Sequence, residues 1–413
     1  MTGVRLTVHR GTQEIGGSCI EIEHPAGDRL ILDAGRPLDA PEGATGLLPG
    51  SLDRSRPATV LISHPHQDHW GLIEELPPTW PIWTGSGSAK LITVTADVTR
   101  HPLTRTFKTW HSRSGPFAIG PFTVTPILTD HSAFDAYMLL VEGAEKRVLY
   151  TGDFRRHGRK STLVDRMMAN PPANVDVLVT EGTNLGSDKP VKSEKEIEQD
   201  FVELFKRTKG RAFVSWSAQN IDRTVSIYRA ARRTGWTLVI DLYTADVLDR
   251  ISERSRLPRA GFPNLKVVVT TRLGSYYRKQ SREDFVARMA KNGISARRLT
   301  RGRYVIMLRR ALIGDYQRAG VVPTADDAFD FSMWRGYLSE PYYTEALEWC
   351  RTGGAEIAYI HTSGHASPAD LRAFATAVRP KMVVPVHGVK WDEEARGFGT
   401  IRRLGDAETL VIP

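Results

Sequence analysis

The sequence predicts an α/β protein with two domains, and three observations support this prediction. At 413 residues the chain is longer than a single compact core usually holds. Its first 35 residues contain short apolar runs, at 4–9, 18–23 and 29–33, separated by glycine-containing turns that are typical of strands. Residues 194–241 then follow the order helix, strand, helix and strand, which indicates a parallel α/β layer.

Composition and charge narrow the class of protein. The chain is 41% hydrophobic and 25% charged, as in ordinary globular proteins. No run approaches the ~20 apolar residues that span a bilayer, and the N-terminus has no signal peptide pattern, so we expect no membrane partner.

Only two cysteines occur, Cys19 and Cys350, which favours free thiols in a reducing cytoplasm. The net charge of +9 favours polyanionic partners, although many basic proteins bind none.

Residues 64–69, His-Pro-His-Gln-Asp-His, directly follow an apolar strand. Three imidazoles and a carboxylate within six residues indicate a metal site rather than a solvated loop. A strand that ends in such a loop can present His64 and His66 on one side, with Asp68 and His69 on the other. Imidazole nitrogen combined with carboxylate oxygen favours zinc, with manganese or iron as alternatives. We therefore expect two divalent ions that share one water.

Four more polar residues each close an apolar run. They are Asp33 after residues 29–32, His131 after 122–128, Asp153 after 148–150, and His387 after 383–386. Residues at the ends of neighbouring strands converge on one rim of a sheet. Five of the twelve histidines of the chain lie at these positions or in the 64–69 block, so the candidate ligands account for a large part of the histidine content.

The His-x-His-x-Asp-His block, with Asp33, His131 and Asp153 in this order, resembles the metallo-β-lactamase family. This resemblance implies an αββα sandwich and two Zn²⁺ ions, with Mn²⁺ as an alternative. The implied ligands are His64, His66 and His131 for one metal, Asp68, His69 and His387 for the second, and Asp153 as the bridge. Asp33 would orient a ligand or hydrogen-bond the loop.

About 230 residues separate Asp153 from His387, which leaves room for an inserted domain. Three segments resemble motifs A, B and C of the β-CASP branch: Val-Thr-Glu-Gly with Glu181, Ser-Gly-His-Ala with His365, and Val-His-Gly with His387. The sequences of the last two segments are most similar to those of ribonuclease J. The resemblance covers residues 1 to about 225 and about 355 to 390. The expected domains are 1–184 and 358–413 for the metallo-β-lactamase fold and 185–357 for an inserted α/β β-CASP domain.

This sequence also departs from ribonuclease J in two ways. The Gly-Ser-Gln-Gly-Glu-Pro loop of that family has no counterpart around residues 303–320. The sequence ends at Pro413, before a C-terminal domain that the family uses in oligomerisation, and Val389 replaces the usual glutamate. The resemblance therefore supports the metal-dependent chemistry more strongly than it supports endonuclease or 5′-exonuclease action, or a homo-oligomer.

The resemblance implies a catalytic set of Asp68, His365 and Glu181. His365 would donate a proton to the leaving oxygen, and the Glu181 carboxylate would orient the ring and favour its protonated form. The alternative is a structural histidine bonded to the start of the helix that Ser367 begins.

Four small polar residues are the expected substrate contacts. Ser363 and Gly364 could offer a hydroxyl and a backbone N–H to a substrate phosphate. Ser217 and Asn220 could do the same from the second domain, or could only cap the helix that follows them.

The predicted function is metal-dependent hydrolysis of phosphodiester bonds in single-stranded RNA, during RNA processing or decay. One alternative is a hydrolase of a small ester, lactone or phosphodiester, which would need neither the insertion nor a basic surface. A DNA-directed nuclease is a second alternative, which His387 makes less favoured because DNA-processing members usually carry valine there. A non-catalytic RNA-binding member is a third, and the intact set of ligands argues against it.

Overall fold

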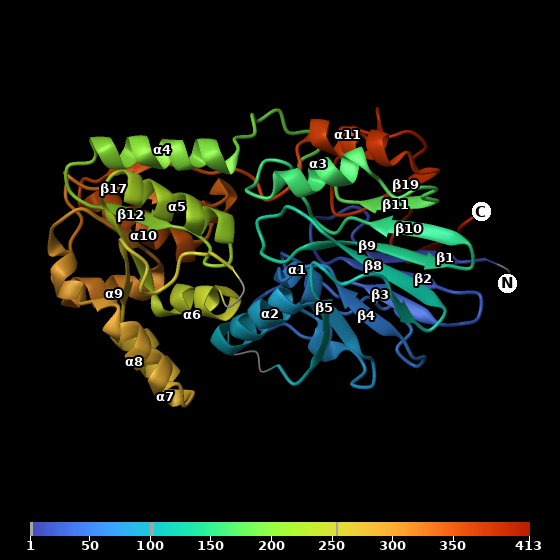
Figure 1. Ribbon diagram of the computed structural model, residues 1–413, viewed down its shortest axis with the longest axis horizontal. Helices are drawn as coiled ribbons and strands as arrows, with labels where there is room; N and C mark the ends of the chain where they lie inside the picture. The colour runs from blue at the N-terminus through green and yellow to red at the C-terminus, as the bar shows by residue number, and fades with distance from the viewer. Residues whose placement is uncertain (1–2, 100–102, 253–254) are drawn as a thin grey trace. The chain divides into compact units, whose positions relative to one another are not determined.

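The computed structural model of the chain describes residues 3–99, 103–252 and 255–413. The chain divides into two compact units: the first is Met1–Pro190 with Gly364–Pro413, and the second is Val191–Ser363. The first unit contains two sheets and the second unit contains a third sheet, and each unit also contains helices (Figure 1). Within the described residues, no helix is both long enough and apolar enough to cross a membrane.

The first unit is built on two sheets that lie face to face. In spatial order, the first sheet contains β20 (Glu408–Val411), β1 (Arg5–Arg10), β2 (Cys19–Glu23), β3 (Arg29–Leu32), β4 (Thr59–Ile62), β5 (Ile82–Gly85) and β6 (Phe107–Trp110). The second contains β19 (Met382–Pro385), β11 (Val177–Thr180), β10 (Lys146–Tyr150), β9 (Tyr137–Gly143), β8 (Phe122–Leu128) and β7 (Phe117–Ile119). Their facing side chains, such as Leu32 and Leu139, form one buried apolar cluster.

Helices cover the outer faces of both sheets. Ile92 of α2 (Ser86–Thr99) packs in an apolar cluster with β4 of the first sheet. Phe374 of α11 (Pro368–Val378) and Val164 of α3 (Ser161–Ala169) pack in another cluster with the second sheet, and Figure 1 shows both helices beside β11 and β19. The order helix, sheet, sheet, helix is the αββα sandwich that the sequence predicts, and the structure confirms it.

The second unit is a parallel α/β layer. Its strands, in spatial order, are β15 (Gly293–Ile294), β14 (Leu265–Val268), β13 (Thr237–Asp241), β16 (Tyr304–Met307), β12 (Ala212–Ser215), β17 (Ala328–Phe331) and β18 (Glu356–Ala358), and neighbouring strands run parallel. Its helices are α4 (Glu194–Arg207), α5 (Ile221–Arg233), α6 (Leu242–Ile251), α7 (Thr271–Lys279), α8 (Glu283–Lys291), α9 (Arg310–Arg318) and α10 (Pro341–Thr352). The expected strand–helix alternation is therefore present.

Local sequence explains why α4 begins where it does. Ser193 accepts a hydrogen bond from the Glu196 N–H, and the Glu196 side chain accepts from the Ser193 N–H, which together form a capping box. Ile197 and Phe201, four residues apart and so on one face of the helix, are buried. The helix therefore starts at a strong capping signal and packs along one apolar face.

Asp330 of β17 is a fully buried carboxyl in the second unit. Its Oδ1 accepts a 2.6 Å hydrogen bond from the Ile360 N–H, whereas its Oδ2 has no hydrogen-bond partner among the described residues. Burial raises the pKa of Asp330 to about 7, although the Ile360 amide and the Arg223 guanidinium act in the opposite direction. The fold therefore favours the protonated form of this side chain.

We expect the Asp330 side chain to make stability fall with rising pH. Because the folded chain holds this proton more tightly than the unfolded chain, the contribution is complete below about pH 4 and is lost as the pH rises through about 7. The loss is at most about 4 kcal/mol, at about 1.4 kcal/mol per pKa unit. Urea unfolding at pH 5.5 and pH 8 measures it. The Asp330→Asn variant should lose this pH dependence, whereas the exposed Asp326→Asn control should keep it; equal pH dependence in the two variants would contradict the assignment.

Candidate metal centre

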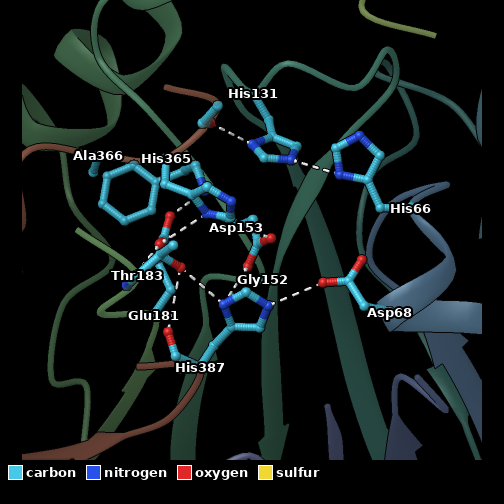
Figure 2. Close-up of polar contacts among 12 residues, drawn as sticks. His66, Asp68, His131, Gly152, Asp153, Glu181, Thr183, His365, Ala366 and His387 are labelled. Carbon is cyan, nitrogen blue, oxygen red and sulfur yellow. Dashed lines mark hydrogen bonds and ion pairs between the residues drawn. The ribbon is translucent and has the colours of Figure 1, made fainter. Parts of the chain in front are cut away.

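The residues predicted as metal ligands gather at one end of the strands of the first unit. His64 and His66 follow β4, Asp68 and His69 lie in the short helix α1 (Gln67–Trp70), His131 follows β8, Asp153 follows β10, and His387 follows β19. Strands β10, β11 and β19 are parallel neighbours, with Thr180 paired to Pro385. Their carboxyl ends therefore present Asp153, Glu181 and His387 side by side, as Figure 2 shows.

Asp153 is the common member of three groups of possible metal ligands. The groups are His64, His66, His131 and Asp153; Asp68, His69, Asp153 and His387; and Asp153, Glu181, His365 and His387. Within each group the ligand atoms lie within 4.8 Å of one another. The Asp153 Oδ2 atom lies 3.2 Å from His69 Nε2 and 3.7 Å from His64 Nε2. A carboxylate oxygen that faces imidazoles of both sets has the geometry of a shared ligand.

Four of the imidazoles are anchored through Nδ1. His64 Nδ1 lies 3.0 Å from Ser63 Oγ, His69 Nδ1 donates to Asp33 Oδ2 at 2.7 Å, His131 Nδ1 donates to the Gly364 carbonyl at 2.7 Å, and His387 Nδ1 lies 2.9 Å from Thr183 Oγ1. In each ring Nε2 is the atom left to face the cluster. Such partners on the far nitrogen fix ring orientation and tautomer in metal-binding histidines.

The centre contains buried polar atoms that the protein itself does not satisfy. Within the described part of the chain, His64 Nε2, His69 Nε2 and both carboxylate oxygens of Asp153 have no hydrogen-bond partner. Leaving a buried polar atom unpaired costs about 1–3 kcal/mol, so a cluster of four such atoms needs a compensating interaction. Divalent cations bound by imidazole nitrogen and carboxylate oxygen supply one, and these residues therefore suit a metal cofactor.

The first group of imidazoles is held neutral. Burial, together with neighbouring imidazoles, lowers the pKa of His64 and of His131 well below the ordinary value. Burial lowers the pKa of His66 to about 4. A neutral imidazole is the form that binds a metal, so these three rings need not lose a proton near neutral pH.

The second group has the opposite electrostatics. Burial alone would lower the pKa of His69, but the carboxylates of Asp153, Asp68 and Asp33 raise it well above the ordinary value. Burial also opposes ionisation of Asp68, yet His69 and His387 lower its pKa to about 2. Carboxylates that favour a positive charge on His69 would also stabilise a divalent cation beside it.

Asp33 connects the two sheets beneath the centre and is fully buried. It accepts hydrogen bonds from the Ser63 N–H at 2.7 Å, the Ser63 hydroxyl at 2.8 Å, the His69 ring at 2.7 Å and the Tyr150 hydroxyl at 2.7 Å. Asp33 and His387 both have left-handed backbone, with φ of 62° and 49°, a conformation that is uncommon outside glycine and recurs at functional sites. Gly35, two residues on, admits the loop because an added Cβ would lie 1.7 Å from the Asp68 carbonyl oxygen.

Ser63, Tyr150 and Thr183 contact predicted site residues but are not themselves among the residues predicted from the sequence. Ser63 directly precedes the histidine block, which is the one local signal that could have identified it. The other two approach through the fold: the Tyr150 hydroxyl reaches Asp33 and the Thr183 hydroxyl reaches His387, 204 positions away. No sequence spacing predicts contacts of that kind.

His365 and Glu181 form a pair beside the metal ligands (Figure 2). His365 Nδ1 lies 3.0 Å from Glu181 Oε2 and 3.6 Å from Asp153 Oδ2. Glu181 is fully buried, and its Oε1 accepts from the Phe154 N–H at 3.0 Å. Burial would lower the pKa of His365, but the carboxylates of Glu181 and Asp153 raise it to about 9. The ring is therefore both oriented and protonated at neutral pH.

The four residues expected to contact substrate have varied surroundings. Gly364 belongs to the first unit, and its carbonyl accepts from His131. Ser363 is the last residue of the second unit. The Asn220 side chain caps α5 by accepting from the Arg223 N–H at 3.0 Å, and Ser217 Oγ accepts from the Gln219 N–H at 3.3 Å. Capping therefore occupies Asn220, and substrate contact by these four residues stays a prediction.

Comparisons with protein families match two parts of the chain. The model of a β-lactamase superfamily domain matches residues 28–232. The model of a Zn-dependent metallo-hydrolase RNA specificity domain matches residues 354–393. The second match contains His365 and His387, two residues of the cluster described above.

Similar proteins extend over nearly the whole chain. Ribonuclease J of Helicobacter pylori strain B128 is 24% identical over 428 residues, covering 99% of this chain and 59% of that protein. Ribonuclease J of Mycobacterium tuberculosis strain H37Rv is 27% identical over 416 residues, covering 94% of this chain and 69% of that protein. The chain thus spans 59% of the length of the Helicobacter relative.

A solved structure has the same fold. The crystal structure of a protein of unknown function from Enterococcus faecalis V583 aligns with a TM-score of 0.81 at 18% identity. The alignment covers 99% of this chain and 100% of that one. At this identity the likeness concerns the arrangement of helices and strands alone.

Proposed function

This chain belongs to the metallo-β-lactamase superfamily, in its ribonuclease J-like β-CASP branch, and from this premise we propose that it is a metal-dependent ribonuclease. The observation that carries the proposal is the convergence of six histidine and aspartate side chains around a seventh, Asp153, with His365 and Glu181 beside them. The substrate we propose is single-stranded RNA, since the curated relatives are named ribonuclease J and the chain has a net charge of +9.

We propose that the centre holds two divalent ions, Zn²⁺ or Mn²⁺. The residues that would hold them are His64, His66 and His131 on one side, Asp68, His69 and His387 on the other, and Asp153 between. When bound, such a pair supplies a nucleophilic water at neutral pH and neutralises the charge that develops on the phosphate. The unsatisfied buried atoms of His64, His69 and Asp153 support this assignment.

His365 has the position of a proton donor in this reaction. When water attacks phosphorus and the bond to the leaving ribose oxygen breaks, that oxygen needs a proton. Glu181 holds His365 at Nδ1 at 3.0 Å, so that Nε2 is the nitrogen that can release a proton to the leaving oxygen. The Asn184 amide donates to the carbonyls of His365 and Ala366, both at 3.0 Å, and fixes the loop that carries the ring.

The proposal also covers the cellular compartment, the residues that contact RNA and the association of copies of the chain. Cys19 and Cys350 are buried free thiols, which suits a cytoplasmic protein. Ser363, Gly364, Ser217 and Asn220 are proposed to contact the RNA backbone through hydroxyl, amide and backbone N–H groups. A homo-oligomer is also part of the proposal, and sedimentation of the purified protein tests it.

The decisive experiment is hydrolysis of end-labelled single-stranded RNA by the purified full chain, with Zn²⁺ or Mn²⁺ added. On RNA labelled at its 5′ end, shortened labelled fragments indicate endonuclease action, whereas a released labelled mononucleotide indicates 5′-exonuclease action. RNAs with 5′-monophosphate and 5′-triphosphate ends show whether cleavage depends on the phosphorylation of that end. Single-stranded DNA, lactones and simple esters serve as alternative substrates. Turnover of these compounds without cleavage of RNA under any metal condition would overturn the proposal.

We expect Asp33→Ala to weaken metal binding by about 10- to 100-fold, the usual cost of losing a partner behind a metal ligand. The reason is that Asp33 orients His69 through the 2.7 Å bond to Nδ1. Competition with a chelating dye measures the affinity. Tyr150→Phe is the matched control because it removes one of the hydrogen bonds to Asp33 and leaves the carboxylate in place. Unchanged affinity in Asp33→Ala would show that Asp33 does not serve the metal.

A further inference from the structure

The second unit contains a cavity of about 190 Å³, distinct from the metal centre. It lies where β12, β16 and β17 end, and its lining includes Trp216, Tyr243, Arg309, Phe331, Tyr342 and Tyr343. All the lining residues belong to the second unit, so the cavity is a property of that unit alone.

The strand order explains why a cavity forms there. The chain leaves β12 through α5 and enters β13, on one side of β12. It leaves the neighbouring β16 through α9 and enters β17, on the other side of β12. The loops after two adjacent strands therefore diverge, and ligands of open parallel α/β sheets bind in such a crevice at the carboxyl ends of the strands.

Aromatic rings form the walls and the mouth of the cavity. Tyr343 packs edge-on to Tyr342, with ring centroids 5.1 Å apart, and stacks on Tyr337 at 5.1 Å. Tyr342 lines the cavity and is 46% exposed. An exposed aromatic ring in a cavity wall offers a face on which a planar ring can stack.

Arg309 supplies a polar group inside this apolar frame. Its Nε is buried and has no hydrogen-bond partner in the part of the chain that the structure describes, although Asp241 Oδ2 lies 3.5 Å away. Its Nη2 donates to Thr244 Oγ1 at 3.1 Å, and its guanidinium lies 5.1 Å from the Tyr243 ring centroid. One N–H donor is therefore unused at the cavity.

The charges around the cavity favour a neutral ligand. Asp241 lies beside Arg309, and Glu345 pairs with Arg310 at 2.5 Å. Each cation thus has a carboxylate partner, and little charge remains for a phosphate. A volume of about 190 Å³ is also below the roughly 300–1,000 Å³ of pockets for drug-sized ligands. The site suits one planar ring that stacks on tyrosine and accepts a hydrogen bond.

We propose that this cavity binds a single nucleobase, either of an RNA chain or of a free nucleotide. The inference rests on the proposed function in one respect, since that function makes a nucleotide the planar ligand to expect. Base stacking on aromatic side chains tolerates any base, and the Arg309 donor can meet an acceptor atom on the edge of the ring. The cavity would then hold one residue of the RNA at a site apart from the metal ligands.

The test measures binding to the full, metal-loaded chain. Uridine and uridine 5′-monophosphate are titrated by calorimetry, and a 12-nucleotide single-stranded RNA with phosphorothioate linkages, which resists cleavage, is titrated by fluorescence anisotropy. Tyr342→Ala removes one exposed wall, and Ala218→Leu fills the cavity from a buried lining position. Each variant should weaken uridine binding about fivefold or more, the lower range for one base–aromatic stack. Tyr276→Ala, a tyrosine of α7 outside the cavity, should leave it unchanged.

The outcomes distinguish a base of an RNA chain from a free nucleotide. They also distinguish failure of this inference from failure of the proposed ribonuclease function. Parallel losses for uridine, the monophosphate and the RNA support a base of the RNA chain, whereas losses for the free compounds alone support a free nucleotide. Equal affinities in the original chain and both variants, or no uridine binding at all, would overturn the inference while RNA hydrolysis could still stand. Loss of uridine binding in the variants of a chain that never cleaves RNA would overturn the proposed function and leave the cavity assigned to a free nucleotide.

Discussion

A chain that carries Asp68→Ala and His69→Ala together is expected to lose RNA hydrolysis by about a thousandfold or more. Both residues face the same proposed metal, and His69 Nε2 lies 3.6 Å from Asp68 Oδ2 and 3.2 Å from Asp153 Oδ2. Metal ions contribute several kcal/mol of charge stabilisation, and each 1.4 kcal/mol or so changes the rate about tenfold. Initial rates on end-labelled RNA measure the loss.

The same double variant should bind less metal. Elemental analysis of the purified protein is expected to give about two ions for the original chain and fewer for the variant, because a zinc site usually needs three or four protein ligands. Asp39→Ala with His111→Ala is the matched control, since it removes the same two residue types at exposed positions of the first unit. Full hydrolysis with a normal metal content in the Asp68 and His69 variant would refute the assignment of both ligands.

His365→Ala should lower the rate of RNA hydrolysis by about 10²- to 10⁴-fold, the usual contribution of a positioned general acid. Its ring lies 3.0 Å from the Glu181 carboxylate and 3.6 Å from Asp153. The metal content should not change if His365 is a proton donor. A lower metal content would instead assign His365 to the third group of ligands, with Asp153, Glu181 and His387.

A substrate with a good leaving group separates proton donation from a structural role. Nitrophenolate leaves without needing a proton, so His365→Ala should hydrolyse a nitrophenyl phosphodiester at close to the original rate. Glu181→Gln keeps the size of the side chain but removes its charge, and should slow RNA hydrolysis without affecting the nitrophenyl compound. Equal losses on both substrates would show that His365 holds the site together and does not donate the proton.

The sequence predicted the fold class and many of its elements because these depend on local pattern. The helix, strand, helix and strand predicted for residues 194–241 are α4, β12, α5 and β13. The capping box at which α4 begins joins Ser193 to Glu196, only three residues on. Periodicity and capping are properties of neighbouring residues, so they can be recognised without the fold.

The ligand types and their order also came from the sequence. Histidines and aspartates that close apolar runs indicated a metal centre, and the structure brings the ligand atoms of the other six residues within 4.8 Å of those of Asp153. Asn220 shows the limit of this reasoning, because its side chain could equally bind a ligand or cap a helix. The structure places it as the cap of α5, through the Arg223 N–H.

Only the tertiary structure decided which distant residues meet. The parallel pairing of β11 with β19 places Glu181 beside His387, although 206 positions separate them (387 minus 181). The hydroxyls of Ser63 and Thr183 contact the ligands His64 and His387, and the Tyr150 hydroxyl contacts Asp33 behind His69. The loops after β12, β16 and β17 line the aromatic cavity of the second unit. Local pattern determines that a segment is a strand and which residue ends it, whereas the order of strands in a sheet depends on packing between segments far apart in the chain.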